Sequence, residues 1–153
     1  MEGLDGIIRE HPFFAGLDER FVELICGCAK NVRFEAGQVL FRGGDAADEF
    51  YLLRHGRVAL EIVAPGRGEL TFQTLAPGEV VGLSWLIPPY RWAYTAKALE
   101  LVRAIAIDGR CLRNKCDADH DLGYEMMKRV VPVLVQRLQG TRLQILDVYG
   151  EVG

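Results

Sequence analysis

Hydrophobic residues change their spacing twice along this 153-residue chain. In residues 1–32 they recur at helical intervals, as Phe21, Leu24, Ile25 and Cys28 do on one helix face. In residues 33–107 short apolar and β-branched runs alternate with glycine-containing turns. From residue 108 to the end the helical spacing returns. The pattern predicts N-terminal helices, a β domain and a C-terminal helical segment.

The central zone contains several short runs that are typical of strands. Glycine and proline separate them, which favours a sandwich or barrel over alternating βαβ units. We therefore expect a single domain that is mainly β with flanking helices. The predicted strands are residues 39–41, 50–53, 57–63, 70–75 and 94–106.

The C-terminal zone carries an apolar stripe with a regular three-four spacing. Such a stripe predicts a long helix that meets a partner helix. Pro132 lacks the N–H of a helical hydrogen bond, so we expect a kink or break there. We expect self-association as a homodimer, and the alternative is that the stripe packs on the chain's own barrel. The stripe consists of Tyr124, Met127, Val131, Leu134, Leu138, Thr141 and Ile145, and it continues to Val148.

Net charge and the length of apolar runs argue against a nucleic-acid-binding or membrane-spanning protein. The net charge of −3 gives no general attraction to nucleic acid. No apolar run reaches the ~18–20 residues of a membrane span, and the N-terminus does not resemble a signal peptide. We therefore expect a cytoplasmic protein that does not interact with membranes.

The four cysteines do not follow a common zinc spacing, so we expect ordinary thiols, with a metal or redox site as the alternative. The acidic run Asp117–Asp121 is more typical of a solvated helix start than of a metal site. We identify no nucleophile, metalloprotease or P-loop motif, and we predict neither catalysis nor a bound metal.

The segment GEVVGLSWLIPPYRWAYT, residues 78–95, has the features of an anion cradle. Gly82 has no Cβ to keep a ligand from the backbone. A helical turn at residues 84–87 would direct free N–H groups at an anion, and Arg91 could add a bidentate contact. The predicted ligand-binding residues are Val81, Gly82, Leu83, Ser84, Trp85, Arg91, Trp92 and Ala93.

Glycines, apolar residues and acidic residues recur at characteristic spacings along nearly the whole chain: the segment HPFFAGLDE and Phe34, Gly37, Val39, Phe41, Gly44, Asp45, Asp48, Phe50, Tyr51, Leu53, Gly56, Val58 and Leu75–Glu79. With these residues the chain resembles the cyclic-nucleotide-binding domain family. The resemblance implies a double-stranded β-helix of the jelly-roll or cupin type. It also implies a regulatory sensor that binds cyclic AMP or cyclic GMP. The WLIPPYRW segment is typical of short stand-alone bacterial members of this family.

Two positions depart from the family pattern. Nucleotide-binding members carry a glutamate after the cassette glycine, where it accepts a hydrogen bond from the ribose, but this chain has Leu83. Losing such a bond weakens binding by about 1.5–3 kcal/mol. Trp92 stands where the family places a small residue after the phosphate-binding arginine. Matching backward from Ala96 places Tyr90 at the arginine's position, but we prefer Arg91 as the phosphate contact.

We therefore expect a non-enzymatic sensor of a small anion that signals through its C-terminal helix to a second copy or another protein. A cyclic nucleotide would bind weakly. The alternative is a ligand-independent dimerisation or docking subunit whose pocket has degenerated. No sequence resembling a recognition helix follows the long helix, so we do not expect direct DNA binding.

Overall fold

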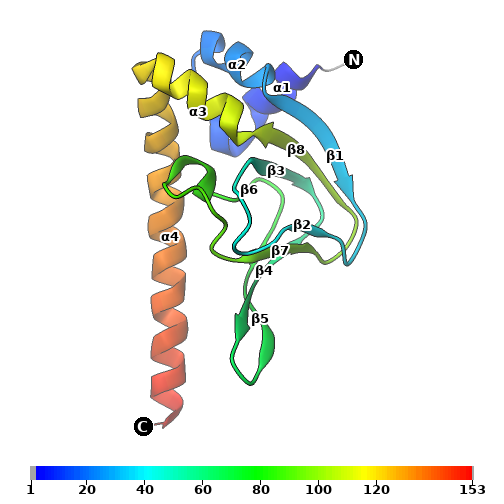
Figure 1. Ribbon diagram of the computed structural model, residues 1–153, viewed down its shortest axis with the longest axis vertical. Coiled ribbons are helices and arrows are strands. Elements are labelled where there is room, and N and C mark those ends of the chain that lie inside the picture. Colours follow the sequence, from blue (N-terminus) through cyan, green and yellow to red (C-terminus); the bar gives the residue numbers. More distant parts are fainter. Residues whose placement is uncertain (1–2, 153) are drawn as a thin grey trace.

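The fold consists of two four-stranded antiparallel sheets, with short helices at one end and one long helix along the side (Figure 1). We describe a computed structural model, which covers residues 3–152 except for the side chains of residues 64 and 141–152. The elements are α1 (Leu4–Glu10), η1 (Pro12–Phe14), α2 (Glu19–Cys26), β1 (Ala29–Phe34), β2 (Val39–Phe41), β3 (Glu49–His55), β4 (Val58–Ala64), β5 (Gly68–Leu75), β6 (Val80–Val81), η2 (Ser84–Leu86), β7 (Thr95–Ala98), β8 (Val102–Asp108), α3 (Gly109–Ala118) and α4 (His120–Val152).

One sheet has the strand order β1-β8-β3-β6 and the other β2-β7-β4-β5. Successive strands alternate between the sheets except for β4 and β5, which form a hairpin in one sheet. The buried aliphatic and aromatic side chains of both sheets lie between them. The predicted jelly-roll architecture, with N-terminal helices and a long C-terminal helix, is confirmed.

The predicted strand at residues 94–106 is in fact two strands, because the chain changes sheets between them. β7 pairs with β2 and β4, whereas β8 pairs with β1 and β3. Gly56 allows the close contact at this corner, since its φ is +87° and an added Cβ would lie 2.2 Å from the carbonyl oxygen of Leu101. Periodicity alone gave no sign of the corner, because the apolar residues continue on both sides of it.

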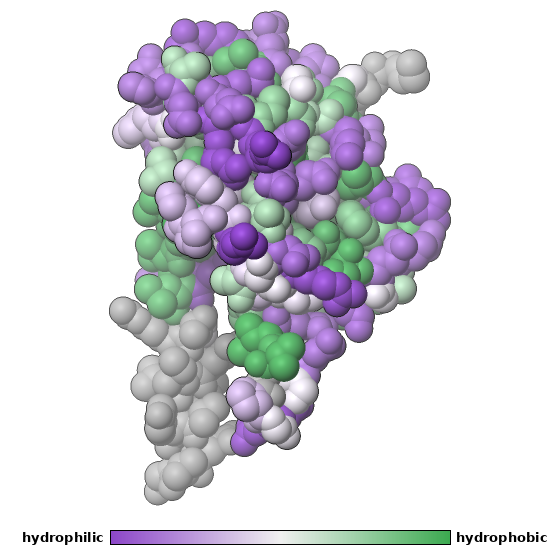
Figure 2. All heavy atoms as spheres, viewed as in Figure 1, coloured by the Kyte–Doolittle hydropathy of each residue, from purple (hydrophilic) through white to green (hydrophobic). Residues whose placement is uncertain are grey.

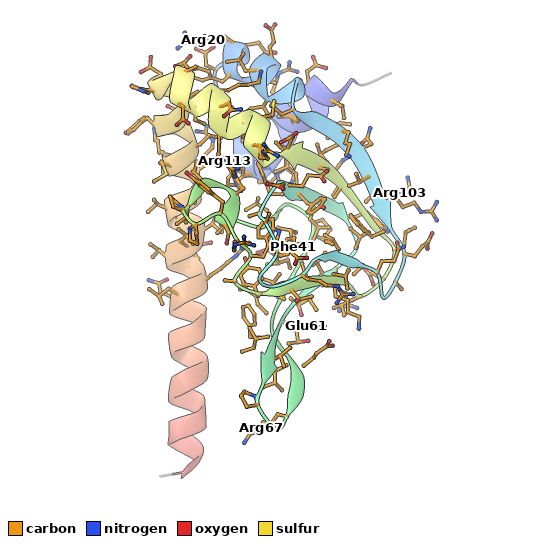
Figure 3. All side chains as sticks on the ribbon, viewed as in Figure 1. Arg20, Phe41, Glu61, Arg67, Arg103 and Arg113 are labelled. Atoms are coloured by element: carbon orange, nitrogen blue, oxygen red, sulfur yellow. A yellow bond between two sulfur atoms is a disulfide. The ribbon has the colours of Figure 1, made fainter. Side chains whose placement is uncertain are left out.

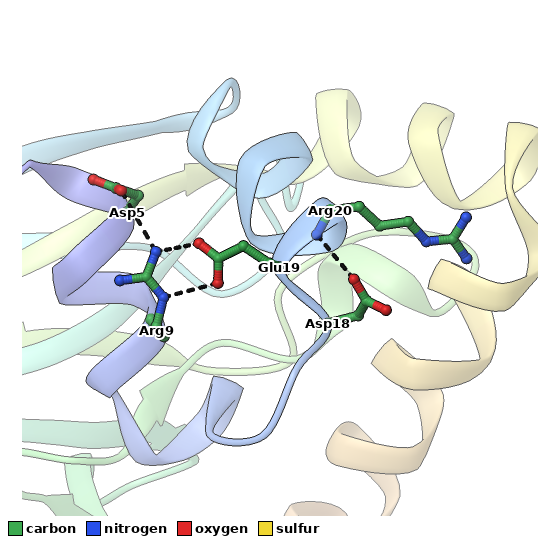
Figure 4. A network of polar contacts seen from close by, with 5 residues as sticks. All are labelled: Asp5, Arg9, Asp18, Glu19 and Arg20. Carbon is green, nitrogen blue, oxygen red and sulfur yellow. Dashed lines mark hydrogen bonds and ion pairs between the residues drawn. The ribbon is translucent and has the colours of Figure 1, made fainter.

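The N-terminal helical zone is shorter than predicted, and its last residues form β1. Asp18 is the N-cap of helix α2, and its carboxylate accepts a hydrogen bond from the backbone N–H of Arg20 (3.0 Å). Arg9 on α1 holds the start of α2 by donating from both Nε and Nη2 to the Glu19 carboxylate (Figure 4). The helix ends at Cys26, and β1 then pairs along its whole length with β8.

The pairing of β1 with β8 also explains a cysteine pair that the sequence analysis missed. Cys28 and Cys111 form a disulfide with Cα atoms 5.8 Å apart, although 83 positions separate them in sequence. Our expectation of ordinary thiols is therefore wrong for these two residues. Cys26 and Cys116 are free.

Helix α4 runs alongside the barrel and continues beyond it (Figure 1). It passes through Pro132, so the break that we considered there does not occur. One face of α4 packs on the protein through Leu122, Met126 and Val130. Within the described part of the chain, no helix is long and apolar enough to cross a membrane.

Candidate functional site

The predicted anion cradle forms a tight turn between β6 and η2. Gly82 has a φ of +100°, a conformation that side chains disfavour, which explains why glycine is needed here. The short helix predicted at residues 84–87 is present as η2, a single 3₁₀ turn over Ser84–Leu86. The N–H of Ile87 bonds to the carbonyl of Ser84 (3.3 Å) and ends that turn.

The indole of Trp92 lies directly over the Gly82 backbone. A Cβ added to Gly82 would be 2.6–2.7 Å from two carbons of that ring. Trp92 is 4% exposed and stacks on Phe41, with ring centroids 3.8 Å apart and planes within 10° of parallel. The space above the glycine that a ligand would use for close approach is therefore filled by the protein's own ring.

Arg91 lies in the solvent-exposed part of the cassette, one residue from the buried Trp92. Its Nη1 donates to the carbonyl oxygen of Gly44 (3.1 Å), and its backbone forms an isolated bridge with Ala46. Tyr90, just before it, has a φ of +58°, which marks an abrupt change of chain direction. The guanidinium is held against the β2–β3 loop.

Trp85 anchors the cassette in the core. It is fully buried and stacks on Phe50 at 4.5 Å, so its indole is not free to face a ligand. Arg113 projects from α3 (Figure 3). It donates to the carbonyl oxygens of Trp85 and Ala47 and lies 4.1 Å over the Tyr90 ring. The cassette is therefore bonded directly to the helix that leads into α4.

A cavity of about 270 Å³ lies between the cassette, the β4–β5–β7 sheet and α4. Leu83, Ser84 and Ala93 contribute to its wall, so three predicted site residues come together here. Val81, Gly82, Trp85, Arg91 and Trp92 are not among its lining residues. The other lining residues are Leu60, Phe72, Gln73, Ile87, Tyr94, Leu134, Arg137 and Leu138.

Arg137 is the cationic residue of this cavity, and the sequence analysis missed it. Its Nη2 donates to the carbonyl oxygen of Val80, at the strand that opens the cassette. It also hydrogen-bonds the side chain of Tyr94; burial raises the pKa of that phenol, and the charge and hydrogen bond of Arg137 oppose the shift. Arg137 lies between Leu134 and Leu138, two residues of the predicted apolar stripe. This position could have indicated that Arg137 lies near the same cavity, but the sequence analysis considered only the apolar residues.

The apolar stripe of α4 is largely exposed in the single chain. The exposed fraction is 64% for Tyr124, 47% for Met127 and 46% for Val131. Leu134 and Leu138 are also exposed in part, although both line the cavity. Figure 2 shows the hydrophobic surface along the middle of α4. The stripe residues Thr141 and Ile145 lie outside the described side chains.

Among the described residues, no group of three or more His, Cys, Asp or Glu side chains is placed to hold a metal ion. His11 is the most buried histidine, and its ring is engaged by the backbone: Nε2 lies 3.2 Å from the Leu53 carbonyl oxygen, and Nδ1 accepts from the N–H of Phe13. Burial, with a smaller contribution from the charge of Arg54, lowers the pKa of His11. The position suits a neutral imidazole that joins η1 to β3.

Sequence comparisons identify the family of the chain. The family model for the cyclic nucleotide-binding domain matches residues 31–119, which is more than half of the chain. The chain is 30% identical over 104 residues to cyclic nucleotide-gated ion channel 18 of Arabidopsis thaliana, covering 65% of this chain and 15% of the channel. It is 24% identical over 145 residues to a CRP-like cAMP-activated global transcriptional regulator of Mycobacterium tuberculosis, covering 95% of this chain and 63% of the regulator. The chain thus spans less than two thirds of these curated relatives.

Structural comparisons extend the likeness to the whole architecture. A crystal structure from Geobacter metallireducens GS-15, of a protein named for cyclic nucleotide binding, superposes with a TM-score of 0.81 at 29% identity. It covers 90% of this chain and 99% of that one. A cyclic nucleotide-binding domain from Methylobacillus flagellatus KT shares the fold, with a TM-score of 0.81 at 18% identity over 96% of this chain and 86% of that one. This chain belongs to the cyclic nucleotide-binding domain family.

Proposed function

We propose that this chain is a non-enzymatic sensor whose small anionic ligand enters the cavity between the cassette and α4. The supporting observation is that the cassette residues Leu83 and Ser84 share this cavity with Arg137 of the C-terminal helix. A ligand there contacts the cassette and α4 at once. A ligand shifts a conformational equilibrium of the protein only if it contacts the two conformations unequally. Because α4 forms part of the cavity wall, a bound ligand can favour one position of this helix over another.

The chemistry of the cavity sets the class of ligand. Its wall is mostly apolar, with a guanidinium, a phenol, the Gln73 amide and the Ser84 hydroxyl as polar groups. This set suits an anion with a flat apolar body, and a cyclic nucleotide is the ligand that family membership suggests. Leu83 offers no acceptor to a ribose hydroxyl, which favours weak nucleotide binding.

Arg137 and Arg91 are the two candidates for the anionic group of the ligand. Arg137 lines the cavity, whereas Arg91 is exposed and bonded to Gly44. The geometry supports Arg137 for the anion, with Arg91 holding the adjoining loop in place. Use of Arg91 as the direct contact would require its side chain to leave the Gly44 carbonyl.

The exposed stripe of α4 supports a homodimer as the form that transmits the response. Tyr124, Met127 and Val131 lie on one side of the helix, and the residues buried against the barrel lie on another. A second copy of α4 packed along this stripe would remove those side chains from water. We infer a cytoplasmic, helix-mediated dimer without direct DNA contacts, in which a further protein reads the position of α4.

One observation favours a second function. Trp92 fills the space over Gly82, which is the arrangement expected of a docking subunit that has lost its ligand. Titration of the wild-type protein with cyclic AMP and cyclic GMP, followed by calorimetry, separates the two functions. A sensor gives a saturable heat that falls in Arg137→Gln and persists in Arg91→Gln. A docking subunit gives no heat with either nucleotide, while the protein stays folded and dimeric.

A further inference from the structure

A second and larger cavity, of about 530 Å³, shares Arg137 and Gln73 with the cassette cavity. Four segments line it: η1 with Pro12 and Phe13, β5 with Gln73, residues 78–80 between β5 and β6, and the face of α4 from Lys128 to Arg137. It contains none of Leu83, Ser84 and Ala93, and is therefore distinct from the site described above.

The wall of this cavity is positively charged. Lys128, Arg129 and Arg137 line it, against the single carboxylate of Glu79. The Glu79 carboxylate accepts a hydrogen bond from the backbone N–H of Ala76 (2.7 Å), within the turn between β5 and β6. Three cations stand against the carboxylates of Glu79 and of Glu125, which is ion-paired with Arg129, and leave a net charge of about +1 in a partly desolvated space, which attracts an anion.

Arg129 is held with its side chain only 14% exposed. Its Nη1 bonds to Glu125 (2.6 Å) and its Nη2 to the carbonyl of Ala15 (3.1 Å). The Nε–H is buried and has no hydrogen-bond partner in the structure. A buried donor without an acceptor is costly, so an anion that reaches this nitrogen gains more than it would at the protein surface.

Pro132 contributes to the same wall through the helix backbone. Because proline has no N–H, the carbonyl of Lys128 does not receive the usual helical bond from residue 132. Lys128 and Pro132 both line the cavity, and Phe13 and Val133 add apolar surface beside them. The site therefore offers cations and an apolar wall together.

We propose that this second cavity is a binding site for a small organic carboxylate with an apolar body. Its carboxylate binds between Lys128 and Arg129, and its body lies against Phe13 and Val133. Arg137 lines both cavities, so binding here also changes the wall of the cassette cavity. Only this last step rests on the proposed sensor function; the site itself does not.

The test uses benzoate as the probe and amide NMR signals of the full chain as the readout, at constant ionic strength. Benzoate is expected to give saturable shifts of the Gly78 and Val133 amides. Benzamide, which has the same ring without charge, and inorganic phosphate, which has charge without the ring, are expected to bind several-fold more weakly.

Gln136→Glu adds a carboxylate to the cavity wall at an exposed position, so the fold should be kept. It is expected to weaken benzoate binding at least several-fold. Gln139→Glu makes the same change on the same helix outside the cavity and should leave binding as it is. Equal benzoate affinity in the two variants, or no saturable shift in the wild type, would overturn the proposal. Shifts centred on Leu83 and Ser84 would do so too, because they would place benzoate in the cassette cavity.

The two proposals fail separately. Cyclic nucleotides report on the cassette cavity through the Ser84 and Tyr94 amides, and benzoate reports on the second cavity through Gly78 and Val133. Loss of one set of shifts leaves the other intact.

Discussion

The indole of Trp92 covers the backbone of Gly82 so closely that two of its carbons would lie within 2.7 Å of an added Cβ. Glycine at this position therefore accommodates the protein's own tryptophan. A ligand group can reach the same backbone only if the ring moves or is removed.

We expect Trp92→Ala to open the cassette and to destabilise the fold at the same time. Loss of the stacked ring should cost about 3–5 kcal/mol, the usual range for a large-to-small change at a buried aromatic. Cyclic-nucleotide affinity should rise in the same variant, measured by calorimetry below its melting temperature. Trp92→Phe keeps an aromatic ring there and serves as the control.

An affinity in Trp92→Ala that is no higher than in the wild type would show that the ring does not restrict the site. A matching rise in Trp92→Phe would point to a change in the surrounding loop instead.

Leu83→Glu should restore an acceptor for a ribose hydroxyl and strengthen cyclic-nucleotide binding. A hydrogen bond to a charged group contributes about 1.5–3 kcal/mol, which corresponds to roughly ten- to a hundred-fold in affinity. Leu83→Gln has similar size without the charge and should gain less. If neither variant differs from the wild type in calorimetry, the ribose is not placed beside residue 83.

Arg113 should couple the cassette to the C-terminal helices. Arg113→Met removes the bonds to the carbonyls of Trp85 and Ala47 and the contact with the Tyr90 ring. We expect a lower melting temperature and faster amide hydrogen exchange at residues 84–91. Arg110→Met changes a neighbouring arginine of α3, whereas the bonds to Trp85 and Ala47 come from Arg113, and it should leave that exchange unchanged. Equal amide exchange in both variants would show that Arg113 does not couple the cassette to the C-terminal helices.

Stability should fall as the solution is made mildly acidic, because of His11. Burial lowers the pKa of this imidazole below its ordinary value of 6.5, so the unfolded chain takes up the proton more readily than the folded one. The contribution of His11 to the free energy of unfolding is fully present above pH 6.5. It is lost as the pH falls from 6.5 to the lowered pKa of the folded state, and below that pKa it no longer changes. Denaturant unfolding at several pH values measures it.

His11→Gln should remove this part of the pH dependence, and His55→Gln, at an exposed histidine, should keep it. An unchanged pH profile in His11→Gln would assign the effect to other groups.

Self-association should depend on the exposed stripe of α4. Val131→Glu places a charge in the middle of the stripe and should convert a dimer into a monomer, as measured by analytical ultracentrifugation. Leu99→Glu changes an equally exposed apolar residue in the β7–β8 turn and should leave the dimer intact. A wild-type monomer at micromolar concentration would rule out this interface.

Much of the fold could be predicted from the sequence, because glycine-punctuated β runs and long helical spacing report directly on local structure. The change of sheet at residues 99–101 could not, since a tertiary close approach at Gly56 produces it. The Cys28–Cys111 bond likewise depends on strand pairing between distant segments.

The candidate site was predictable only in part. Gly82 and the short helix after it are local features, and both are present. The contribution of α4 was missed, because the apolar spacing pointed to Leu134 and Leu138 and left out Arg137, the polar residue between them that lines the same cavity. Arg91 and Trp92 are adjacent in sequence and were predicted together, but Arg91 is exposed and Trp92 is buried.

The central claim is that a ligand in the cassette cavity changes how α4 packs. Hydrogen–deuterium exchange of the full chain, with and without saturating cyclic AMP, tests it most directly. The account predicts that the nucleotide changes amide protection at residues 80–86 and at residues 130–138 together, and that Arg137→Gln uncouples the second segment from the first. A nucleotide that protects the cassette but leaves α4 unchanged, or that alters neither segment, would contradict it.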